Sequence, residues 1–256
     1  MEFNFKDKVV IVTGSTSGIG AAAALKFANL YAKVVIVGRN EERLKAVKEQ
    51  VKNAKGIEPL AIKADVANDA DVKKIVEQTI ERFGRIDVLV NNAGVGGFSS
   101  LEDGIEPFDK IISTNLRSVY LLTGLVTPYL KKTKGNIINI SSLAGLKPVP
   151  EFLAYSVSKA GLDMFTKCLA KSLAPDGIRV NSVNPGPVTT NFQTTSGMSK
   201  QQEDEFYKNR TEKSPFNKIA TADEVADLTV FLASDRAGSI TGSLHLIDNG
   251  LMNAPY

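Results

Sequence analysis

Tyr155 and Lys159 lie four positions apart in the stretch AYSVSKAGL, whose other residues are mostly small or apolar. On a helix, this spacing places both side chains on one face and within reach of each other. A phenol with its reference pKa of about 10 is a poor base at neutral pH, but a nearby ammonium group favours the phenolate and lowers that pKa. Such a tyrosine would suit proton exchange with an alcohol or a carbonyl oxygen. The pair indicates an acid/base site, although the same spacing is common on helix surfaces.

A glycine-rich turn follows the first apolar run, where KVVIVT at 8–13 continues into TGSTSGIG at 13–20. Its glycine spacing, GxxxGxG, differs from the GxGxxG fingerprint of dinucleotide-binding turns. Glycines let the backbone approach a pyrophosphate closely, and the helix expected after the turn offers N–H groups and a positive dipole end to anionic oxygens. The turn indicates a phosphate site, with a structural connection as the alternative. The expected phosphate-binding residues are Gly14, Ser15, Thr16, Ser17, Gly18, Ile19 and Gly20.

The ends of the second and third apolar runs indicate which dinucleotide would bind. An acidic residue after the second strand would hydrogen-bond the ribose 2′-OH of NAD, but KVVIVG at 33–38 is followed by Arg39. A guanidinium can pair with a 2′-phosphate, which favours NADP(H) without excluding NAD(H); a solvated arginine is the alternative. Asp65 could accept a hydrogen bond from the adenine amino group, with Val66 packed on the ring, or simply cap a turn.

Short apolar, β-branched runs recur along the chain, with helix-length segments between them. Continuous rather than alternating apolarity is typical of strands covered on both faces of a parallel sheet. The clearest helical segment is expected to be capped by Asn68 and to end at Gly84. The alternation predicts an α/β fold, namely a single doubly wound Rossmann-type domain over residues 1–256 with about seven parallel strands flanked by helices on both faces. The expected strands are 8–13, 33–38, 59–64, 86–91, 136–141, 178–183 and 243–248.

Residues 187–218 interrupt this regularity, because they are polar and contain no expected strand. Long irregular segments inside a compact fold are more often functional lids than linkers. We therefore expect this segment to close over a substrate site.

The composition favours a small partner in a reducing compartment. Lys and Arg total 31 against 28 Asp and Glu, and the basic residues are scattered, which gives little support for binding to nucleic acid or to a membrane surface. No apolar run is long enough for a membrane span, and the first residues carry charge where a signal peptide needs an apolar run. A cytoplasmic protein is expected.

The only cysteine and the only histidine are expected to be structural. Cys168 cannot form an intramolecular disulfide, and it lies in the helical stripe MFTKCLAKSLA, where a buried small hydrophobic residue is expected. His245 lies in the apolar run SLHLID and is expected to be packed and hydrogen-bonded. No metal site is expected from this inventory.

Several short motifs occur along the chain in one order: TGSTSGIG at 13–20, DV at 65–66, NNAG at 91–94, Asn115 in STNLRSVY, ISS at 140–142, YSVSK at 155–159 and NPGPVTT at 184–190. With this order and spacing, the sequence resembles the short-chain dehydrogenase/reductase family over essentially its whole length. Each motif alone is only moderately specific, and their joint order makes the resemblance specific.

The resemblance implies roles for four residues. In the family, the tyrosine matched by Tyr155 is the acid/base, and the lysine matched by Lys159 lowers its pKa and holds the cofactor ribose. The serine matched by Ser142, thirteen residues before the tyrosine, hydrogen-bonds the substrate oxygen; Ser141 competes for this role, and the family spacing selects Ser142. The residue matched by Asn115 supports a water-linked proton relay.

The resemblance also implies further cofactor contacts. The matched residues are Asn91, Ala93, Gly94, Pro185, Gly186, Val188 and Thr190, of which Val188 acts through its backbone and Thr190 through its hydroxyl. Many NADP-dependent members carry a basic residue where this chain has Ser17, so Arg39 alone is expected to set the cofactor preference. Near the C-terminus, Asp248, Asn249 and Gly250 replace the family's common DGG, which puts a local turn in doubt.

Together these features predict an NADP(H)-dependent oxidoreductase that moves a hydride between nicotinamide and a lipophilic ketone, aldehyde or secondary alcohol, with a tyrosine acid/base. Substrate contacts are expected from residues 95–98 and 143–152 and from the lid, including Phe192. The helix from Tyr155 to Ala174 resembles the family's oligomer interface, so a homodimer or homotetramer is expected.

Two other functions stay open. A 3-oxoacyl reductase acting on a carrier-protein or coenzyme A thioester shares the motif set, and members of that type place arginines near the positions of Thr133 and Asp176, where Lys131, Lys132 and Lys134 could substitute. A non-catalytic NADP(H)-binding sensor could keep the same fold. Retention of Ser142, Tyr155 and Lys159 argues against a sensor, which needs no tuned phenol.

Overall fold

The computed structural model describes residues 3–253, and its centre is one parallel sheet of seven strands in the order β3-β2-β1-β4-β5-β6-β9. Every predicted apolar run coincides with one of these strands, although β6 extends two residues beyond its run, and the doubly wound α/β fold is confirmed. The strands are β1 (Val9–Thr13), β2 (Lys33–Gly38), β3 (Leu60–Lys63), β4 (Val88–Asn91), β5 (Asn136–Ile140), β6 (Arg179–Pro185) and β9 (Leu244–Ile247).

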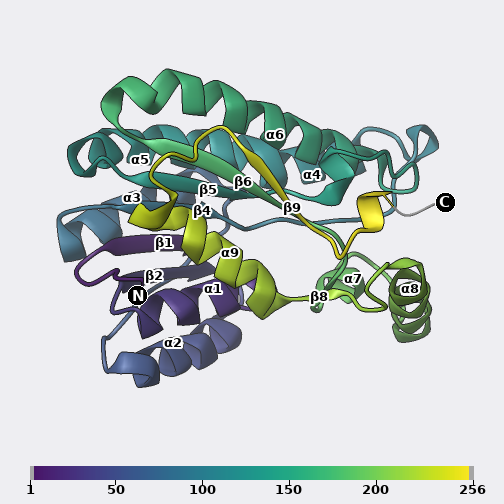
Figure 1. Cartoon of the computed structure of the whole chain (residues 1–256), viewed down its shortest axis with the longest axis horizontal. Coiled ribbons are helices and arrows are strands. Elements are labelled where there is room, and N and C mark those ends of the chain that lie inside the picture. Colours follow the sequence, from purple (N-terminus) through teal and green to yellow (C-terminus); the bar gives the residue numbers. More distant parts are fainter. Residues whose placement is uncertain (1–2, 254–256) are drawn as a thin grey trace.

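Helices cover both faces of the sheet, as Figure 1 shows. Alternate residues of β1 face opposite sides, so that Val10 and Val12 join one apolar core while Val9 and Ile11 join the other. The first core is closed by α1 (Gly18–Asn29), α2 (Glu41–Lys55) and α9 (Ala222–Ala233). The second is closed by α3 (Asp69–Phe83), α5 (Ser118–Thr133) and α6 (Leu153–Leu173). This double cover explains why the strands are continuously apolar.

The local signals at α3 act as predicted. The side chain of Asn68 accepts hydrogen bonds from the backbone N–H groups of Ala70 and Asp71, at 2.9 and 3.1 Å. Gly84 ends the helix in the left-handed region, with φ of 70°. After β3, the chain returns through α3 to β4 on the other side of β1. The strand order therefore reverses between β1 and β4, which is where an open α/β sheet forms a ligand crevice.

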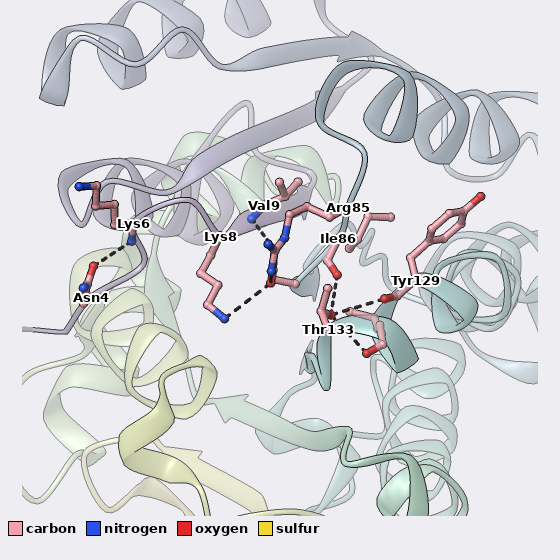
Figure 2. Close-up of polar contacts among 10 residues, drawn as sticks. Asn4, Lys6, Lys8, Val9, Arg85, Ile86, Tyr129 and Thr133 are labelled. Carbon is pink, nitrogen blue, oxygen red and sulfur yellow. Dashed lines mark hydrogen bonds and ion pairs between the residues drawn. The ribbon is translucent and has the colours of Figure 1, made fainter.

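The amino ends of the strands, away from this crevice, are tied together by a buried carboxylate. Asp87 accepts a hydrogen bond from the Val9 N–H at 2.9 Å, and Arg85 and Lys8 approach it at 2.6 and 3.7 Å (Figure 2). Thr133, at the end of α5, donates to the Ile86 carbonyl at 2.8 Å (Figure 2). These bonds hold the sheet together and leave its carboxyl end free for chemistry.

The expectation that residues 187–218 contain no strand is wrong. Two residues, Val188 and Thr189, form β7, which pairs in parallel with β8 (Ala220–Thr221). The helices α7 (Phe192–Thr195) and α8 (Lys200–Lys213) lie between these strands, and Figure 1 shows them projecting at one end of the molecule. A two-residue strand leaves no periodic signal in a sequence, so pattern reading misses it.

Cys168 and His245 depart from their expected settings. Cys168 is exposed, because α6 buries the side that carries Thr166, Ala170 and Leu173 and turns Cys168 outward. His245, on β9, is partly buried, but its Nε2 has no hydrogen-bond partner among the described residues. Burial lowers the pKa of His245, which favours the neutral imidazole.

The turn placed in doubt by its sequence is formed. Asn249 adopts a φ of 54°, a left-handed conformation that asparagine tolerates better than most residues. The carboxylate of Asp248 accepts hydrogen bonds from the N–H groups of Gly250 and Met252, at 3.0 and 2.5 Å. The asparagine therefore replaces the family's glycine without loss of the turn.

Residues 3–253 contain neither a candidate membrane span nor a candidate metal cluster. None of their helices has the length and apolarity needed to cross a bilayer. Within the same residues, no three His, Cys, Asp or Glu side chains gather in a way that could hold a metal ion.

Candidate active site

The glycine turn between β1 and α1 is shaped by close backbone contacts. A Cβ on Gly14 would lie 2.8 Å from the Cα of Ala93, and one on Gly20 would lie 2.5 Å from the Gly14 carbonyl oxygen. The side chain of Ser17, at the N-cap of α1, makes no capping hydrogen bond. The first N–H groups of α1 are therefore left without the usual side-chain acceptor, as an anion-binding helix start requires.

Behind this turn, buried polar side chains fix the strand ends. Thr13 Oγ1 accepts hydrogen bonds from the N–H groups of Asn92 and Ala93, both at 3.0 Å, which shapes the loop after β4. The Nδ2 of Asn91 donates to Asn139 Oδ1 at 2.9 Å, within the sheet. The glycine turn and the NNAG loop thus form one rigid wall.

The adenosine end of the crevice lies at the ends of β2 and β3. Arg39 Nη1 contacts Asp65 Oδ2 at 3.3 Å, and both side chains are exposed. Asp65 Oδ1 also accepts from the Ala67 N–H at 2.9 Å, so the turn-capping role is filled as well. Asn40 caps α2, and Arg43, whose N–H bonds the Asn40 side chain at 2.8 Å, faces the same cavity as Arg39.

The α6 helix carries Tyr155 and Lys159 at the centre of the cavity. The Nζ of Lys159 lies 5.6 Å from the centroid of the Tyr155 ring and donates to the Ile140 carbonyl at 2.8 Å. The Tyr155 hydroxyl shares a hydrogen bond with Ser142. The hydroxyl of Ser141 is buried and donates instead to the Lys159 carbonyl at 3.2 Å. Ser142 is therefore the serine whose hydroxyl faces the tyrosine.

Asn115 lies in a π-helical turn, Ser113–Arg117, between α4 (Glu106–Ile112) and α5. Its Oδ1 accepts from the Val95 N–H at 2.8 Å, and its Nδ2 donates to the Val95 carbonyl and Ser158 Oγ at 2.9 and 3.1 Å. A Cβ on Gly94 would lie 3.4 Å from Asn115 Oδ1 and 3.6 Å from Lys159 Nζ. The two polar groups flank one point beside Gly94. Single π-helical turns of this kind often occur at functional sites.

One cavity of about 890 Å³ runs along these groups, although Asn115 lies behind its wall and is not among the residues that line it. It extends from Arg39 and Arg43 past the glycine turn to Ser142, Tyr155 and Lys159, and on to the lid segment. The apolar residues of the lining beyond Tyr155 include Val149, Pro150, Phe152, Phe192 and Phe206, and they alternate with polar residues such as Asn191, Gln193 and Arg210. Such a cavity can hold a dinucleotide and a small organic molecule end to end.

Comparison with known proteins identifies the relatives of this fold and site. The profile of a family described as Enoyl-(Acyl carrier protein) reductase matches residues 14–252. An uncharacterized oxidoreductase of Thermotoga maritima is 40% identical over 249 residues, which cover 96% of this chain and 98% of that protein.

Solved structures agree. A short-chain dehydrogenase/reductase of Caenorhabditis elegans, crystallised with cofactor, is 35% identical with a TM-score of 0.93, over 98% of this chain and 97% of that one. The chain belongs to the short-chain dehydrogenase/reductase family. L-sorbose reductase of Gluconobacter frateurii, in complex with NADPH and L-sorbose, is 31% identical with a TM-score of 0.91, over 100% of both chains.

Burial governs the proton affinities of the tyrosine and lysine in this short-chain dehydrogenase/reductase. Burial raises the pKa of Tyr155 to about 12, against a hydrogen bond with Ser142 that lowers it. Burial also lowers the pKa of Lys159 to about 8, although the nearby carboxylate of Asp163 acts in the opposite direction and raises it. The expected net lowering of the Tyr155 pKa is not found in this structure, because desolvation of the phenolate dominates.

Several expected cofactor and substrate contacts lie away from the cavity wall. Ser15 is fully buried and accepts from the Val37 N–H at 2.8 Å, so it ties the turn to β2. Gly20 and Asn91 likewise support the wall from behind. Phe98 stacks on Phe152, with ring centroids 4.8 Å apart, and does not itself line the cavity; Gly97 and Leu146 are also outside it. The other expected cofactor contacts, namely Gly14, Thr16, Ser17, Gly18, Ile19, Arg39, Asp65, Val66, Ala93, Gly94, Pro185, Gly186, Val188 and Thr190, line the cavity.

Sequence reasoning did not name several of the residues that line the cavity of this family member. Arg43 was detectable, because a cap at Asn40 places the residue three positions later on the first turn of α2. Phe206 and Arg210 of the lid helix also line the cavity, and no motif marks them.

Proposed function

We propose that this chain is an NADP(H)-dependent reductase of lipophilic carbonyl compounds, which also oxidises the corresponding alcohols. The observation that carries the proposal is the convergence of the Ser142, Tyr155 and Lys159 side chains in a cavity whose far end holds Arg39 and Arg43. The uncapped start of α1 and the glycine contacts at Gly14 fit a dinucleotide pyrophosphate between these two ends.

A nicotinamide cofactor, when bound, supplies or accepts the hydride. The protein's own contribution is proton transfer and orientation. Tyr155, with its pKa raised to about 12, is protonated at neutral pH and suits the donor role in carbonyl reduction. Its proton goes to the carbonyl oxygen, which Ser142 orients by hydrogen bonding. The positive charge of Lys159 then stabilises the phenolate that remains, and Asn115 supports proton resupply beside Gly94.

The preference for NADP(H) rests on two arginines rather than one. Arg39 and Arg43 both face the adenosine end, and a 2′-phosphate would compete with Asp65 for the Arg39 guanidinium. The NADPH complex of the related L-sorbose reductase supports this choice. We further propose that residues 187–218 act as the lid of a single domain, because α7 and α8 flank the cavity through Phe192 and Phe206.

The central test is replacement of the proton donor. Tyr155→Phe should lower the rate of NADPH oxidation in the presence of lipophilic diketones or aldehydes by about 1,000-fold or more, because the proton donor is lost. Its NADPH dissociation constant, measured by fluorescence titration, should stay within about threefold of wild type. Tyr31→Phe is the matched control, since Tyr31 is exposed and does not line the cavity. Turnover close to wild type in Tyr155→Phe would refute the mechanism.

A 3-oxoacyl reductase is the second candidate, favoured by the acyl-carrier enzyme in the description of the matching family. The lysines that could substitute for the arginines of that enzyme type give this candidate little support, because Lys131 is paired with Asp176 at 2.9 Å. Assays with 3-oxoacyl thioesters of coenzyme A and of carrier protein discriminate this candidate. Cofactor binding with no Tyr155-dependent turnover of any compound would favour the sensor.

Self-association is proposed through the outer face of α5 and α6. Val157 and Met164 of α6 and Tyr120 of α5 are large, exposed apolar side chains on these helices. A second copy that covers this face would bury them, which is the usual reason for such an exposed cluster. Met164→Glu should shift the mass measured by light scattering towards the monomer, whereas an unchanged mass would place the interface elsewhere.

A further inference from the structure

We propose that the substrate carries an anionic group, a carboxylate or a phosphate, which Arg210 and Lys213 of α8 hold on the side of the cavity that this helix lines. This inference rests on the proposed reductase function and names its substrate class. The substrate would then have three parts: a carbonyl at Tyr155 and Ser142, an apolar body, and an anion at α8.

One face of α8 carries the observation. Phe206, Arg210 and Lys213 follow each other at four- and three-residue spacing and all line the cavity. The guanidinium of Arg210 lies over the Phe206 ring, 5.4 Å from its centroid, which holds the side chain along the cavity wall. The helix α8 therefore presents to the cavity an aromatic side chain followed by two cations, of which Arg210 is partly buried and Lys213 is exposed.

The described part of the chain gives these two cations no carboxylate partner. Within residues 3–253, neither Arg210 nor Lys213 forms an ion pair, whereas Lys200 on the same helix pairs with Glu203 and Asp204, both at 3.0 Å. Cations that converge on a cavity without a protein counter-ion raise the local concentration of anionic ligands. Arginine is suited to this role, because its planar fork binds carboxylate and phosphate through two parallel hydrogen bonds.

Other charged side chains also line the cavity. Lys147 is one of them, and its Nζ donates to the Met252 carbonyl oxygen at 3.5 Å. Glu151 is an acidic lining residue, and it is exposed, as is Lys213. Arg210 and Lys213 together outweigh the single carboxylate of Glu151. The arginines that face the cofactor adenosine, Arg39 and Arg43, follow β2 and belong to other elements.

The experiment compares acids with their neutral esters. The probes are a series of aryl ketones that end in a carboxylate on two- to five-carbon chains, their methyl esters, and the phosphate monoesters of the matching hydroxyketones. Binding to the NADPH complex of Tyr155→Phe is measured by calorimetry, and KM is measured with the wild-type active site. The variants are Arg210→Gln and Lys213→Gln, with Lys208→Gln as control, because Lys208 lies on α8 but does not line the cavity.

The expected result is that wild type binds the best acid or phosphate at least tenfold more tightly than the neutral partner. Arg210→Gln should weaken anion binding about tenfold, Lys213→Gln about threefold to tenfold, and Lys208→Gln less than twofold, with ester binding unchanged throughout. The preference between carboxylate and phosphate probes identifies which anion the site takes.

Three outcomes would overturn the inference. If no acid or phosphate in the series binds better than its neutral partner, the anion site does not exist. Equal losses for acid and ester in Arg210→Gln would make the residue a structural part of the lid. Weaker NADPH binding in that variant, with acid binding unchanged, would assign the cations to the cofactor. Failure of the reductase proposal itself is seen separately, as Tyr155-independent or absent turnover of the esters.

Discussion

Asn184 donates hydrogen bonds from its side-chain amide to both carboxylate oxygens of Asp163, at 3.0 Å each, and both residues are buried. The same amide donates to the Ser142 carbonyl at 3.2 Å, and Ser182 Oγ lies 3.3 Å from Asp163 Oδ1. Asp163 is four residues beyond Lys159 on α6. One carboxylate thus connects the serine loop, β6 and the catalytic helix.

Loss of this carboxylate should destabilise the fold. Asp163→Ala removes the two shortest acceptors of the buried Asn184 amide, which keeps only the Ser142 carbonyl, and we expect the free energy of unfolding to fall by about 3 kcal/mol. Urea denaturation of wild type and variant measures the difference. Asp176→Ala, which removes an exposed ion pair with Lys131, is the control and should cost less than about 1 kcal/mol. Similar losses in both variants would contradict a special role for Asp163.

The same carboxylate should make stability depend on pH. Burial raises the pKa of Asp163, so between the ordinary aspartate value of about 3.9 and the raised value the folded state binds more protons than the unfolded state. The contribution of Asp163 is therefore most favourable at low pH and falls as pH rises through the raised value. Asp163→Asn should remove this decline from the unfolding free energy measured across the acidic range; an identical pH profile would show that another group causes it.

Lys159 should set the alkaline limit of carbonyl reduction. Because burial lowers its pKa to about 8, its charge is lost above that pH and the Tyr155 phenolate loses its stabilising partner. We expect kcat/KM for NADPH-dependent reduction to fall as pH rises through about 8. Asp163→Asn should move this fall to lower pH, since Asp163 opposes the lowering of the Lys159 pKa. If the fall in kcat/KM occurs at the same pH in the variant, a group other than Lys159 causes it.

Cofactor preference should respond to both arginines. Arg39→Ala and Arg43→Ala should each raise the NADPH dissociation constant about tenfold, because one charge-assisted contact to the 2′-phosphate is lost. NADH binding should change less than about threefold in the same titrations, because NADH has no 2′-phosphate. Arg117→Ala removes an exposed arginine paired with Asp69 and serves as control. Equal losses for the two cofactors would exclude a 2′-phosphate contact.

The glycine turn should tolerate no side chain at its tightest point. A Cβ on Gly20 would meet the Gly14 carbonyl oxygen, which belongs to the rigid backbone, so Gly20→Ala should cost about 1–3 kcal/mol of stability and weaken NADPH binding. Gly97→Ala, where a Cβ meets nothing within 4 Å, should be close to neutral in both measurements. Comparable behaviour of the two variants would mean that the turn can shift to make room.

The strands of the central sheet and the helices that flank it could be predicted from the sequence, because the patterns that indicate them are local. Strands covered on both faces must be continuously apolar, and helix ends need caps such as Asn68 and Gly84, so both can be recognised within a few residues. Cys168 was misplaced because apolar residues occur on more than one side of α6, and only the packed structure shows which side is buried.

The site was predictable where a motif marks it and not elsewhere. Tyr155, Lys159 and Ser142 have fixed spacings, whereas Asp163 and Asn184 are brought together by the docking of α6 on β6. The pKa values of the site could not be predicted from the sequence, because the pKa of Tyr155 depends on how much water the surrounding side chains exclude.

The π-helical turn at Ser113–Arg117 restricts how the length of this chain can vary. A π-helical turn contains one residue more than the α-helical path it replaces. Deletion of a single residue there would let the helix relax to a regular α-helix, and every side chain on one side of the deletion would rotate by about 100° relative to the other. Asn115 would then lose its two bonds to the Val95 backbone. A substitution in this turn changes one side chain. A deletion changes which residues of α4 and α5 face the core, all at once. The turn is therefore sensitive to chain length as well as to residue type.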